Sequence, residues 1–238
     1  MSRRPGRFGP KAMSPERKRE MFARHPFFSS LPSVDLDKVV RHAQPLTCPR
    51  GEVIFHKGDE GRGLLAVVRG AVKISVPSTE GREIVLNLIR EGEIFGEVAL
   101  LDGEPRSADA TAVQDCELLA LDRRDFLPLL QEIPGLAHKL MELLCRRLRK
   151  TSEQVEDLMF LDLPTRLARA VLRLAGPGAR RPIRITQKEL GELIGMSRES
   201  TNRQLRVWQE RGWVRVDKTG LVVTDAVALS RHNLAEEV

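Results

Sequence analysis

The pattern of hydrophobic and polar positions changes character along the chain. Between residues 25 and 130, short apolar or alternating runs recur about every 8–12 residues, and turn signals that contain glycine separate them. Regular short strands with glycine turns are typical of a β-sandwich or jelly roll, so we predict a β-roll here. The runs that we expect to form strands are 53–55, 64–68, 72–76, 84–89 and 118–121.

The pattern then becomes helical, because residues 134–160 contain no proline after Pro134 and no glycine after Gly135. Six positions in this stretch are spaced by alternating steps of three and four, as in the a/d seam of a coiled coil. They are Met141, Leu144, Leu148, Thr151, Val155 and Leu158. We predict that two copies of the helix pair along this seam. The alternative is a helix packed on its own domain, which needs a wider apolar stripe.

One residue of this seam does not suit an apolar interface. Thr151 carries a hydroxyl group, which needs a hydrogen-bond partner when it is buried. The seam covers only about two and a half heptads, so by itself it would be a marginal zipper.

The C-terminal part of the chain carries the signals of two short helices. Thr186 and Glu189 form a capping box that opens the first helix, and Gly195 ends it. Ser197 is the predicted N-cap of a second helix over 198–208. Two short helices joined through a glycine turn form a helix-turn-helix, whose second helix is the candidate for the major groove of DNA.

The flanking residues complete this pattern. Asp162 is the predicted N-cap of an earlier helix, with Pro164 in its first turn. The apolar run over 213–223, interrupted by a turn that contains Gly220, predicts a β-hairpin. A hairpin in this place would be the wing of a winged helix.

The side chains of the second helix suit base recognition. Arg198 and Arg203 can each donate two hydrogen bonds to guanine, and Glu199 can accept one from cytosine. Arg206 and Lys188 suit phosphate contacts. The alternative is an ordinary surface helix pair, but the caps, the turn and the wing together favour DNA binding. The expected DNA-contacting residues are Thr186, Gln187, Lys188, Ser197, Arg198, Glu199, Asn202, Arg203 and Arg206.

Composition is compatible with a nucleic-acid partner. The 238 residues include 39 Lys and Arg against 33 Asp and Glu, a net charge of +6. An arginine-rich codon usage would give the same net charge. Only the location of the basic residues can therefore indicate whether the chain binds nucleic acid. Residues 1–24 are basic and contain few apolar side chains before Met21. We expect a flexible, mostly disordered tail there, with room for a short helix at its end.

Several classes of protein are disfavoured. Cys48, Cys116 and Cys145 lie far apart and form no CxxC, which argues against disulfides or zinc and for a reducing cytoplasm. We find neither an apolar run of about 18 residues nor a signal peptide, so no membrane association is expected. The five histidines are scattered, and we expect neither a metal site nor an enzyme such as a phosphodiesterase.

Residues 95–108 combine the groups that recognise a nucleotide. Gly96 and Glu97 open a short helix, where glycine lets the backbone approach a ligand closely. Arg106 and Ser107 follow ten residues later, and can donate hydrogen bonds to a phosphate. Glu97 can accept from sugar hydroxyls. The ordered set predicts a bound sugar phosphate.

The motifs, and their order along the chain, resemble those of the CRP/FNR transcription regulators. Residues 95–107 are similar to the phosphate-binding cassette of the cyclic-AMP receptor protein branch, and the resemblance covers roughly residues 25–225. It implies an α+β fold with a cyclic-nucleotide-binding β-roll, a long dimerisation helix and a winged helix-turn-helix. The cysteine cluster of iron–sulfur relatives is absent, and no ligand set matches that of haem-sensing relatives.

The resemblance also implies how the chain divides. The tail would cover 1–24, the β-roll 25–134, the dimerisation helix with its hinge 135–162, and the DNA-binding domain 163–238. The hinge between the domains would consist of Phe160, Leu161 and Asp162.

The ligand roles implied by the resemblance involve both subunits. Glu97 would bind the ribose 2′-hydroxyl, and Arg106 the cyclic phosphate. Thr151 of one subunit and Ser152 of the partner subunit would reach the purine, which explains a hydroxyl in the seam. The implied ligand-binding residues are Gly96, Glu97, Val98, Ala99, Arg106, Ser107, Arg147, Thr151 and Ser152.

The implied function is that of a homodimeric regulator that a 3′,5′-cyclic nucleotide activates, binding double-stranded DNA at a TGTGA-like palindrome and contacting RNA polymerase. The hydroxyl groups of Thr151 and Ser152 favour cAMP, although both could also bind the guanine of cGMP. Asn202 stands where the receptor protein has a small residue, so the preferred base at one position of the half-site could differ from that of TGTGA. The alternative is a regulator of the same family that needs no ligand or takes a different one.

Overall fold

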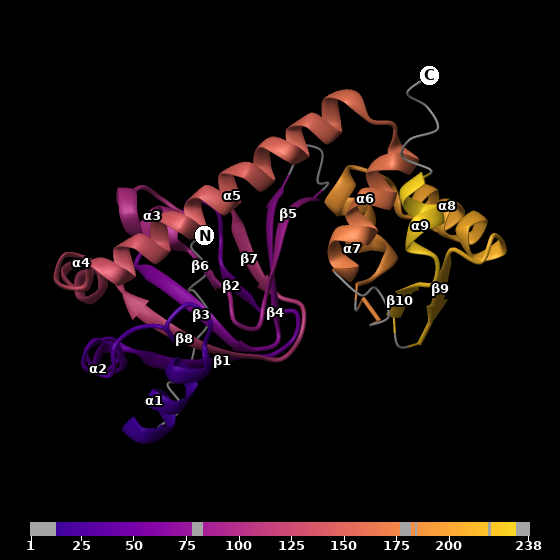
Figure 1. Ribbon diagram of the computed structural model, residues 1–238. Helices are drawn as coiled ribbons and strands as arrows, with labels where there is room; N and C mark the ends of the chain where they lie inside the picture. The colour runs from indigo at the N-terminus through magenta and orange to yellow at the C-terminus, as the bar shows by residue number, and fades with distance from the viewer. Residues whose placement is uncertain (1–12, 78–82, 177–181, 184, 219, 232–238) are drawn as a thin grey trace. The chain divides into compact units, whose positions relative to one another are not determined.

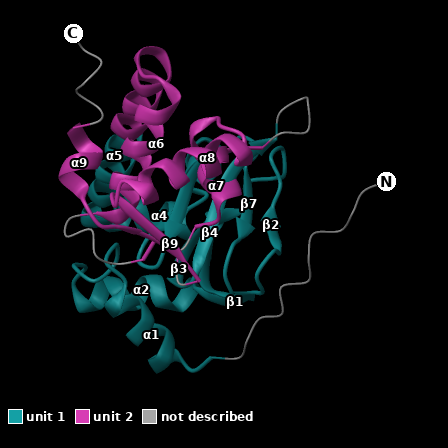
Figure 2. Cartoon of the chain, turned by 90° about the vertical axis from the view of Figure 1, so that its right-hand side faces the viewer, with its two compact units in different colours: residues 1–79, 86–147 teal, residues 80–85, 148–238 magenta. Residues whose placement is uncertain are grey.

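The computed structural model describes residues 13–77, 83–176, 182–183, 185–218 and 220–231. The chain forms two compact units, which Figure 2 distinguishes by colour. The first contains residues 1–79 and 86–147, and the second contains 80–85 and 148–238. The division falls inside the longest helix, so this helix contributes to both units. Residues 1–12 of the expected tail lie outside the described residues.

The first unit is built on two four-stranded sheets (Figure 1). The strands are β1 (Gln44–Cys48), β2 (Val53–Phe55), β3 (Gly63–Arg69), β4 (Ala71–Pro77), β5 (Glu83–Arg90), β6 (Ile94–Phe95), β7 (Asp109–Ala112) and β8 (Cys116–Asp122). Their order is β1-β8-β3-β6 in one sheet and β2-β7-β4-β5 in the other. The five predicted runs correspond to β2, β3, β4, β5 and β8, which confirms the predicted β-roll.

Both faces of the first sheet are buried. In β3, Leu65 and Val67 belong to the core between the sheets, whereas Leu64 and Ala66 belong to a second core with the helices. Successive side chains of a strand point to opposite faces, so burial of both faces gives an almost continuous apolar run. Phe95, at the end of β6, lies in the core between the sheets and immediately precedes Gly96.

Besides the first half of the longest helix, the described part of the first unit contains the helices α1 (Pro15–Arg24), α2 (Ser33–His42), α3 (Glu97–Asp102) and α4 (Arg123–Glu132). Residues 15–24, which we assigned to the flexible tail, therefore form a complete helix. Its N-cap is Ser14, whose side chain accepts a hydrogen bond from the backbone of Arg17. Phe22 is fully buried, and its ring lies 4.7 Å from that of Phe28. This apolar anchor fixes α1 to the core.

His25, which follows α1, gives the first unit a specific pH dependence. Burial lowers its pKa to about 4 from 6.5, while the backbone of Glu93 and of Val67 opposes the shift. The unfolded chain therefore binds more protons than the folded one between these pH values. Stability is retained above pH 6.5 and is lost as the pH falls towards 4, by about 3 kcal/mol.

This prediction is tested by chemical unfolding at a series of pH values. The wild type should lose about 3 kcal/mol more than His25→Asn between pH 6.5 and 4, because asparagine keeps an acceptor but does not titrate. Parallel stability profiles for the two proteins would contradict the assignment.

Two buried thiols face each other in the first sheet. Cys48 of β1 and Cys116 of β8 are register partners, although they are far apart in the sequence. Burial raises the pKa of Cys48 to about 12, with further contributions from Glu52 and Cys116, and burial also raises the pKa of Cys116. Both are free thiols, and at neutral pH we expect them to stay protonated and unreactive.

Apart from residues 80–85, the second unit consists of the end of α5 (Pro134–Phe160) and a small helical domain. Its other elements are α6 (Leu163–Ala175), α7 (Gln187–Ile194), α8 (Arg198–Glu210), β9 (Val214–Asp217), β10 (Gly220–Val223) and α9 (Ala226–Arg231). The strands β9 and β10 pair as an antiparallel hairpin after α8 (Figure 1). Trp208 and Leu205 of α8 are buried in the core of this unit. The helix-turn-helix and the wing are therefore confirmed.

No helix among the described residues is both long and apolar enough to span a membrane. Within the same ranges, no group of three or more histidine, cysteine, aspartate or glutamate side chains is placed to hold a metal ion.

Candidate functional site

The predicted ligand segment forms a tight turn and a short helix. Gly96 is the N-cap of α3 and has a φ of +82°, in the left-handed region that favours glycine. A Cβ atom at this position would lie only 2.6 Å from Nη1 of Arg106. The close approach between the turn and the Arg106 side chain therefore requires glycine.

Arg106 is held inside the first unit by contacts on several sides. Only 7% of the residue is exposed. Its Nη1 donates to the carbonyl oxygen of Gly96 at 2.8 Å, and its Nη2 donates to that of Gly63 at 2.7 Å. The guanidinium also lies over the ring of Phe55, with Cζ 4.2 Å from the centroid. Burial lowers the pKa of Arg106, and the charges of Glu97 and Asp59 oppose the shift. At neutral pH the group stays a cation.

Glu97, the first residue of α3, is 2% exposed and forms an ion pair with Arg147 of α5. Arg147 donates to Oε1 of Glu97 through Nη1 and to the carbonyl oxygen of Ile94 through Nη2. Arg147 thus joins the long helix to the start of the short one. A cation at this point offsets the cost of burying the Glu97 carboxylate.

Two polar atoms of this cluster have no partner. Oε2 of Glu97 and Nε of Arg106 are buried and make no hydrogen bond to any residue that the structure describes. Buried polar groups are normally satisfied, so such atoms point to a bound partner. A molecule with both a hydroxyl donor and an anionic acceptor would satisfy the two atoms together. A sugar phosphate has these two groups, so the residues present fit such a ligand.

The structure brings together Gly96, Glu97, Arg106 and Arg147 of the predicted ligand residues. Ala99 is buried in α3, whereas Val98 on the same helix is 44% exposed. Ser107 is exposed beside the buried Arg106. Thr151 and Ser152 are exposed on α5, about one turn beyond Arg147, and Oγ of Ser152 donates to the carbonyl oxygen of Leu148 at 3.1 Å.

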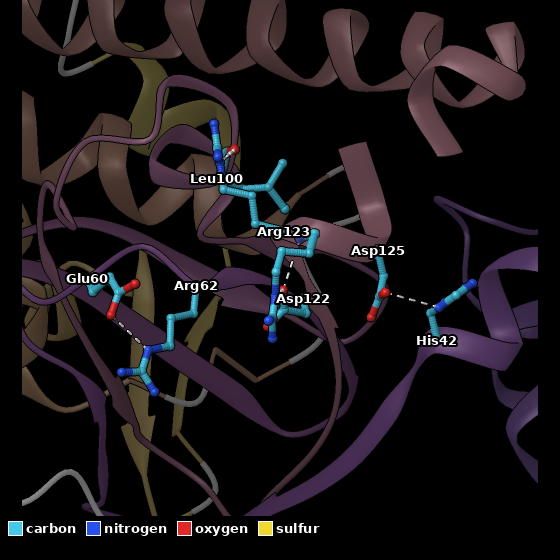
Figure 3. A network of polar contacts seen from close by, with 8 residues as sticks. His42, Glu60, Arg62, Leu100, Asp122, Arg123 and Asp125 are labelled. Atoms are coloured by element: carbon cyan, nitrogen blue, oxygen red, sulfur yellow. Dashed lines mark hydrogen bonds and ion pairs between the residues drawn. The ribbon is translucent and has the colours of Figure 1, made fainter. Parts of the chain in front are cut away.

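Arg123 anchors the other end of α3, a role that no motif in the sequence indicates. Its Nε donates to the carbonyl oxygen of Leu100 at 2.6 Å, and its backbone N–H donates to the carbonyl oxygen of Arg62 at 2.8 Å. Figure 3 shows Arg123 beside Leu100 and Asp122 in this network. A cation at the C-terminal end of a helix is favourable, so Arg123 stabilises the helix that carries Glu97.

The predicted dimer seam is a row of exposed apolar side chains along α5. Leu148 is 69% exposed, and Met141, Val155 and Leu158 are each more than half exposed. Leu144 is partly buried. Large apolar side chains that recur along one helix and remain exposed mark an interaction surface.

The turn between α7 and α8 is closely packed. The capping box of Thr186 and Glu189 is present, and Gly195 ends α7 in the left-handed conformation, as predicted. A Cβ atom on Gly191 would lie 2.7 Å from the backbone oxygen of Met196 and 2.8 Å from Oγ1 of Thr201. Glycine at this position therefore allows the two helices to approach each other.

The helix α8 presents a polar face opposite its buried one. Ser197 caps the helix by accepting a hydrogen bond from the backbone of Ser200 at 3.1 Å. On the inner face, Thr201, Leu205 and Trp208 are buried. The side chains with the chemistry for base and phosphate contacts remain accessible, and Arg198, Glu199, Arg203 and Arg206 are exposed, while Asn202 is partly buried. Lys188 is exposed on α7 and pairs with Glu192.

An ion-pair cluster around a buried aspartate spans the predicted hinge. Asp162 caps α6 as predicted, by accepting from the backbone of Thr165 at 2.9 Å. One turn before the end of α5, Asp157 is 6% exposed. Its Oδ1 lies 2.8 Å from Arg169, and its Oδ2 lies 2.7 Å from Arg173. Two arginines of α6 thus hold the last turn of α5.

Asp157→Asn should therefore destabilise the second unit, because it removes the charge from two hydrogen-bonded pairs. We expect a loss of about 1–2 kcal/mol, since both arginines are more than a third exposed and solvent screens part of the interaction. The control is Glu60→Gln, which removes the carboxylate of the exposed Arg62–Glu60 pair and should cost at most about 0.5 kcal/mol. Equal effects in thermal unfolding would show that the Asp157 cluster adds no stability.

Comparisons with known proteins cover both units. Residues 45–133 match the family described as Cyclic nucleotide-binding domain, and residues 165–232 match the Crp-like helix-turn-helix domain. The chain is 31% identical over 220 residues to a CRP-like cAMP-activated global transcriptional regulator of Mycobacterium tuberculosis, covering 90% of this chain and 98% of the relative. It is 39% identical over 204 residues to the cyclic AMP receptor protein of Thermus thermophilus, covering 86% and 94%.

Solved structures with the same fold include the catabolite activator protein of Thermus thermophilus. That chain is 38% identical, with a TM-score of 0.52 and coverage of 88% of this chain and 98% of the other. FixK2 from Bradyrhizobium japonicum is 20% identical, with a TM-score of 0.72 and coverage of 81% and 96%. At that identity the second likeness concerns the fold alone. The name of the Mycobacterium tuberculosis relative is that of a transcriptional regulator, not of an enzyme.

Proposed function

Because the chain belongs to the CRP/FNR family of transcription regulators, we propose that it is a homodimeric, sequence-specific DNA-binding protein that a 3′,5′-cyclic nucleotide activates. We further propose that cAMP is favoured over cGMP. The observation that carries the proposal is the pair of buried, unpartnered polar atoms, Glu97 Oε2 and Arg106 Nε.

The ligand would be held by the residues of the cassette. Glu97 Oε2 would accept a hydrogen bond from the ribose 2′-hydroxyl, while Arg106 and Ser107 would donate to the cyclic phosphate. The Arg106 guanidinium has five N–H donors, and two of them already hold the carbonyl oxygens of Gly96 and Gly63. Its remaining donors, Nε–H included, are available for an anion.

The exposed seam of α5 would be the dimer interface. The apolar side chains of Leu148, Val155 and Leu158 would be buried against the same residues of a second copy, with the symmetry of a two-fold interface. Thr151 follows Arg147 by four residues on this helix, which places both on one helix face. Its hydroxyl, together with Ser152 of the partner subunit, would then recognise the purine.

The relatives support cAMP as the favoured ligand. The Mycobacterium tuberculosis protein is called cAMP-activated, and the Thermus thermophilus protein is called a cyclic AMP receptor protein. Guanine could also be bound by the hydroxyl groups of Thr151 and Ser152, so cGMP is the second candidate.

DNA recognition would be carried by α8. Arg198 and Arg203 would read guanine and Glu199 would read cytosine in each half of a TGTGA-like palindrome. In a dimer, the two half-sites would be separated by about one turn of DNA. RNA polymerase would be the further protein partner at the promoter.

Activation would be a shift between two states of the dimer. A ligand shifts such an equilibrium only if it binds one state more tightly than the other. The cyclic nucleotide would therefore bind more tightly to the state in which the two α8 helices match successive major grooves. DNA and ligand would, by linkage, strengthen the binding of each other.

Titration calorimetry of the purified protein with cAMP, and separately with cGMP, tests the ligand assignment. We expect saturable binding of one nucleotide per chain, with cAMP the tighter ligand. Tighter binding of cGMP would overturn the proposed preference. Absence of binding by both would overturn the proposed activation by cyclic nucleotides and favour a regulator of this family that needs no such ligand.

A further inference from the structure

The aromatic ring beneath Arg106 has no role in the proposed function so far. Phe55 is the last residue of β2 and is partly buried. Its ring centroid lies 4.2 Å from Cζ of Arg106, and 5.9 Å from the centroid of Phe95. Phe55 thus lies between the core of the roll and the cation of the cassette.

The backbone around Arg106 is already fixed next to β2. The Arg106 N–H donates to the carbonyl oxygen of Asp59 at 2.8 Å, and the Arg106 carbonyl oxygen accepts from Gly58 at 2.8 Å. Phe55 and Ala110 are register partners between β2 and β7, which begins three residues after Arg106. The fold therefore brings the ring and the guanidinium together from distant parts of the sequence.

We propose that Phe55 is a positioning residue for the ligand, which holds the Arg106 guanidinium by a cation–π interaction. The inference rests on the proposed function, because it concerns the group that would bind the cyclic phosphate. The carbonyl oxygens of Gly96 and Gly63 accept hydrogen bonds from Nη1 and Nη2 of the guanidinium and so hold two of its nitrogen atoms. The ring supports it from one face, so the side chain is oriented before the ligand arrives.

Burial makes this interaction strong. An aromatic face attracts a cation more strongly when water is excluded, and only 7% of Arg106 is exposed. Without the aromatic face, only the two carbonyl oxygens would orient the guanidinium, and part of its ordering would have to take place when the ligand binds. Ordering one long side chain weakens affinity by about three- to tenfold.

A different role for Phe55 would be that of an apolar side chain that only fills the core beside Phe95. The two roles predict different responses to the electron density of the ring. Fluorine atoms withdraw electrons from the ring face while they change its shape little. They weaken a cation–π interaction in steps, whereas an apolar contact is hardly affected.

The decisive experiment introduces 4-fluoro-, 3,5-difluoro- and 3,4,5-trifluorophenylalanine at position 55 and measures the Kd for cAMP and cGMP by calorimetry. We expect the affinity to fall stepwise with the number of fluorine atoms, to about a tenth of the wild-type value. Phe27 offers a matched control, because its ring packs on that of Phe28 at 4.9 Å. The same series there should leave the Kd unchanged.

Two ordinary substitutions complement the series. Phe55→Leu keeps an apolar side chain and should weaken ligand binding about three- to tenfold, whereas Phe55→Tyr keeps the aromatic face and should remain within about twofold. A flat fluorine series in a protein that binds ligand, or equal affinities of the leucine and tyrosine variants, would overturn the role of Phe55. If the wild type binds neither nucleotide, the proposed ligand fails instead, and the inference about Phe55 fails with it.

Discussion

Arg106→Leu should weaken the binding of the cyclic nucleotide by at least about 100-fold and abolish the response of DNA binding to the ligand. The reason is that the substitution removes the buried cation that would face the cyclic phosphate. Hydrogen bonds from a charged donor contribute about 1.5–3 kcal/mol each, and two of them give the expected loss. Calorimetry gives the affinity, and a DNA-binding titration with and without ligand gives the response.

Loss of folding would imitate this result, because Arg106 also binds the carbonyl oxygens of Gly96 and Gly63. Thermal unfolding of each variant has to be measured alongside the affinity. Arg106→Lys keeps the charge without the planar fork and should bind ligand with an intermediate affinity. Arg124→Leu is the control, since the Arg124 side chain is 91% exposed and should leave the affinity unchanged. A folded Arg106→Leu protein that still responds to the ligand would favour a different or ligand-independent mode of activation.

Arg203→Ala should weaken specific DNA binding by about 2–6 kcal/mol in the dimer, because each half-site loses a base contact worth about 1–3 kcal/mol. The loss corresponds to roughly 30- to 2 × 10⁴-fold in affinity. Specificity should relax at one position of each half-site, since an arginine reads a guanine through O6 and N7. A titration against a panel of single-base variants of the palindrome measures both effects.

Arg206→Ala is the matched comparison on the same helix. Arg206 is exposed further along α8, where a phosphate contact is expected. Its loss should weaken binding to all sequences equally and lower the dependence on salt by about one unit per subunit. An Arg203→Ala protein that keeps its preference for the palindrome would remove Arg203 from base recognition.

Local signals predicted much of this structure. The capping box of Thr186, the caps Asp162 and Ser197, and the end of α7 at Gly195 are all present. Each of these depends on hydrogen bonds within a few residues, so the sequence contains what is needed. The continuous apolar run of β3 and the three-four spacing of the α5 seam are also local properties of the sequence.

The helices of the first unit were harder to predict from the sequence. Within residues 25–130 the sequence predicted one short helix, at Gly96 and Glu97, and otherwise strands and turns, whereas α2 and α4 are also helical. In α4, Pro128 lies within the helix and obscured its pattern. The basic composition around α1 suggested disorder, but a single buried side chain, Phe22, provides the packing that composition does not reveal.

Contacts between distant residues could not be predicted. Cys48 and Cys116 are far apart in the sequence, yet strand pairing makes them neighbours. Nothing in the sequence links Phe55 to Arg106, because their approach depends on the position of β2 beside β7. The two arginines on Asp157 follow from the packing of α6 on α5. The spacing of residues 95–107 predicted a ligand site, and the fold supplied the groups that orient Arg106.

The central claim is that a cyclic nucleotide bound at the cassette increases the affinity for DNA. The most direct test is a fluorescence anisotropy titration of the full chain against a TGTGA-type palindrome, at fixed salt, without ligand, with saturating cAMP and with saturating cGMP. We predict that affinity for the palindrome rises at least fivefold with the activating nucleotide, the lower end of typical coupling between sites at roughly 1 kcal/mol. Affinity for a scrambled sequence should change little. Equal affinity for the palindrome in all three conditions would contradict the claim.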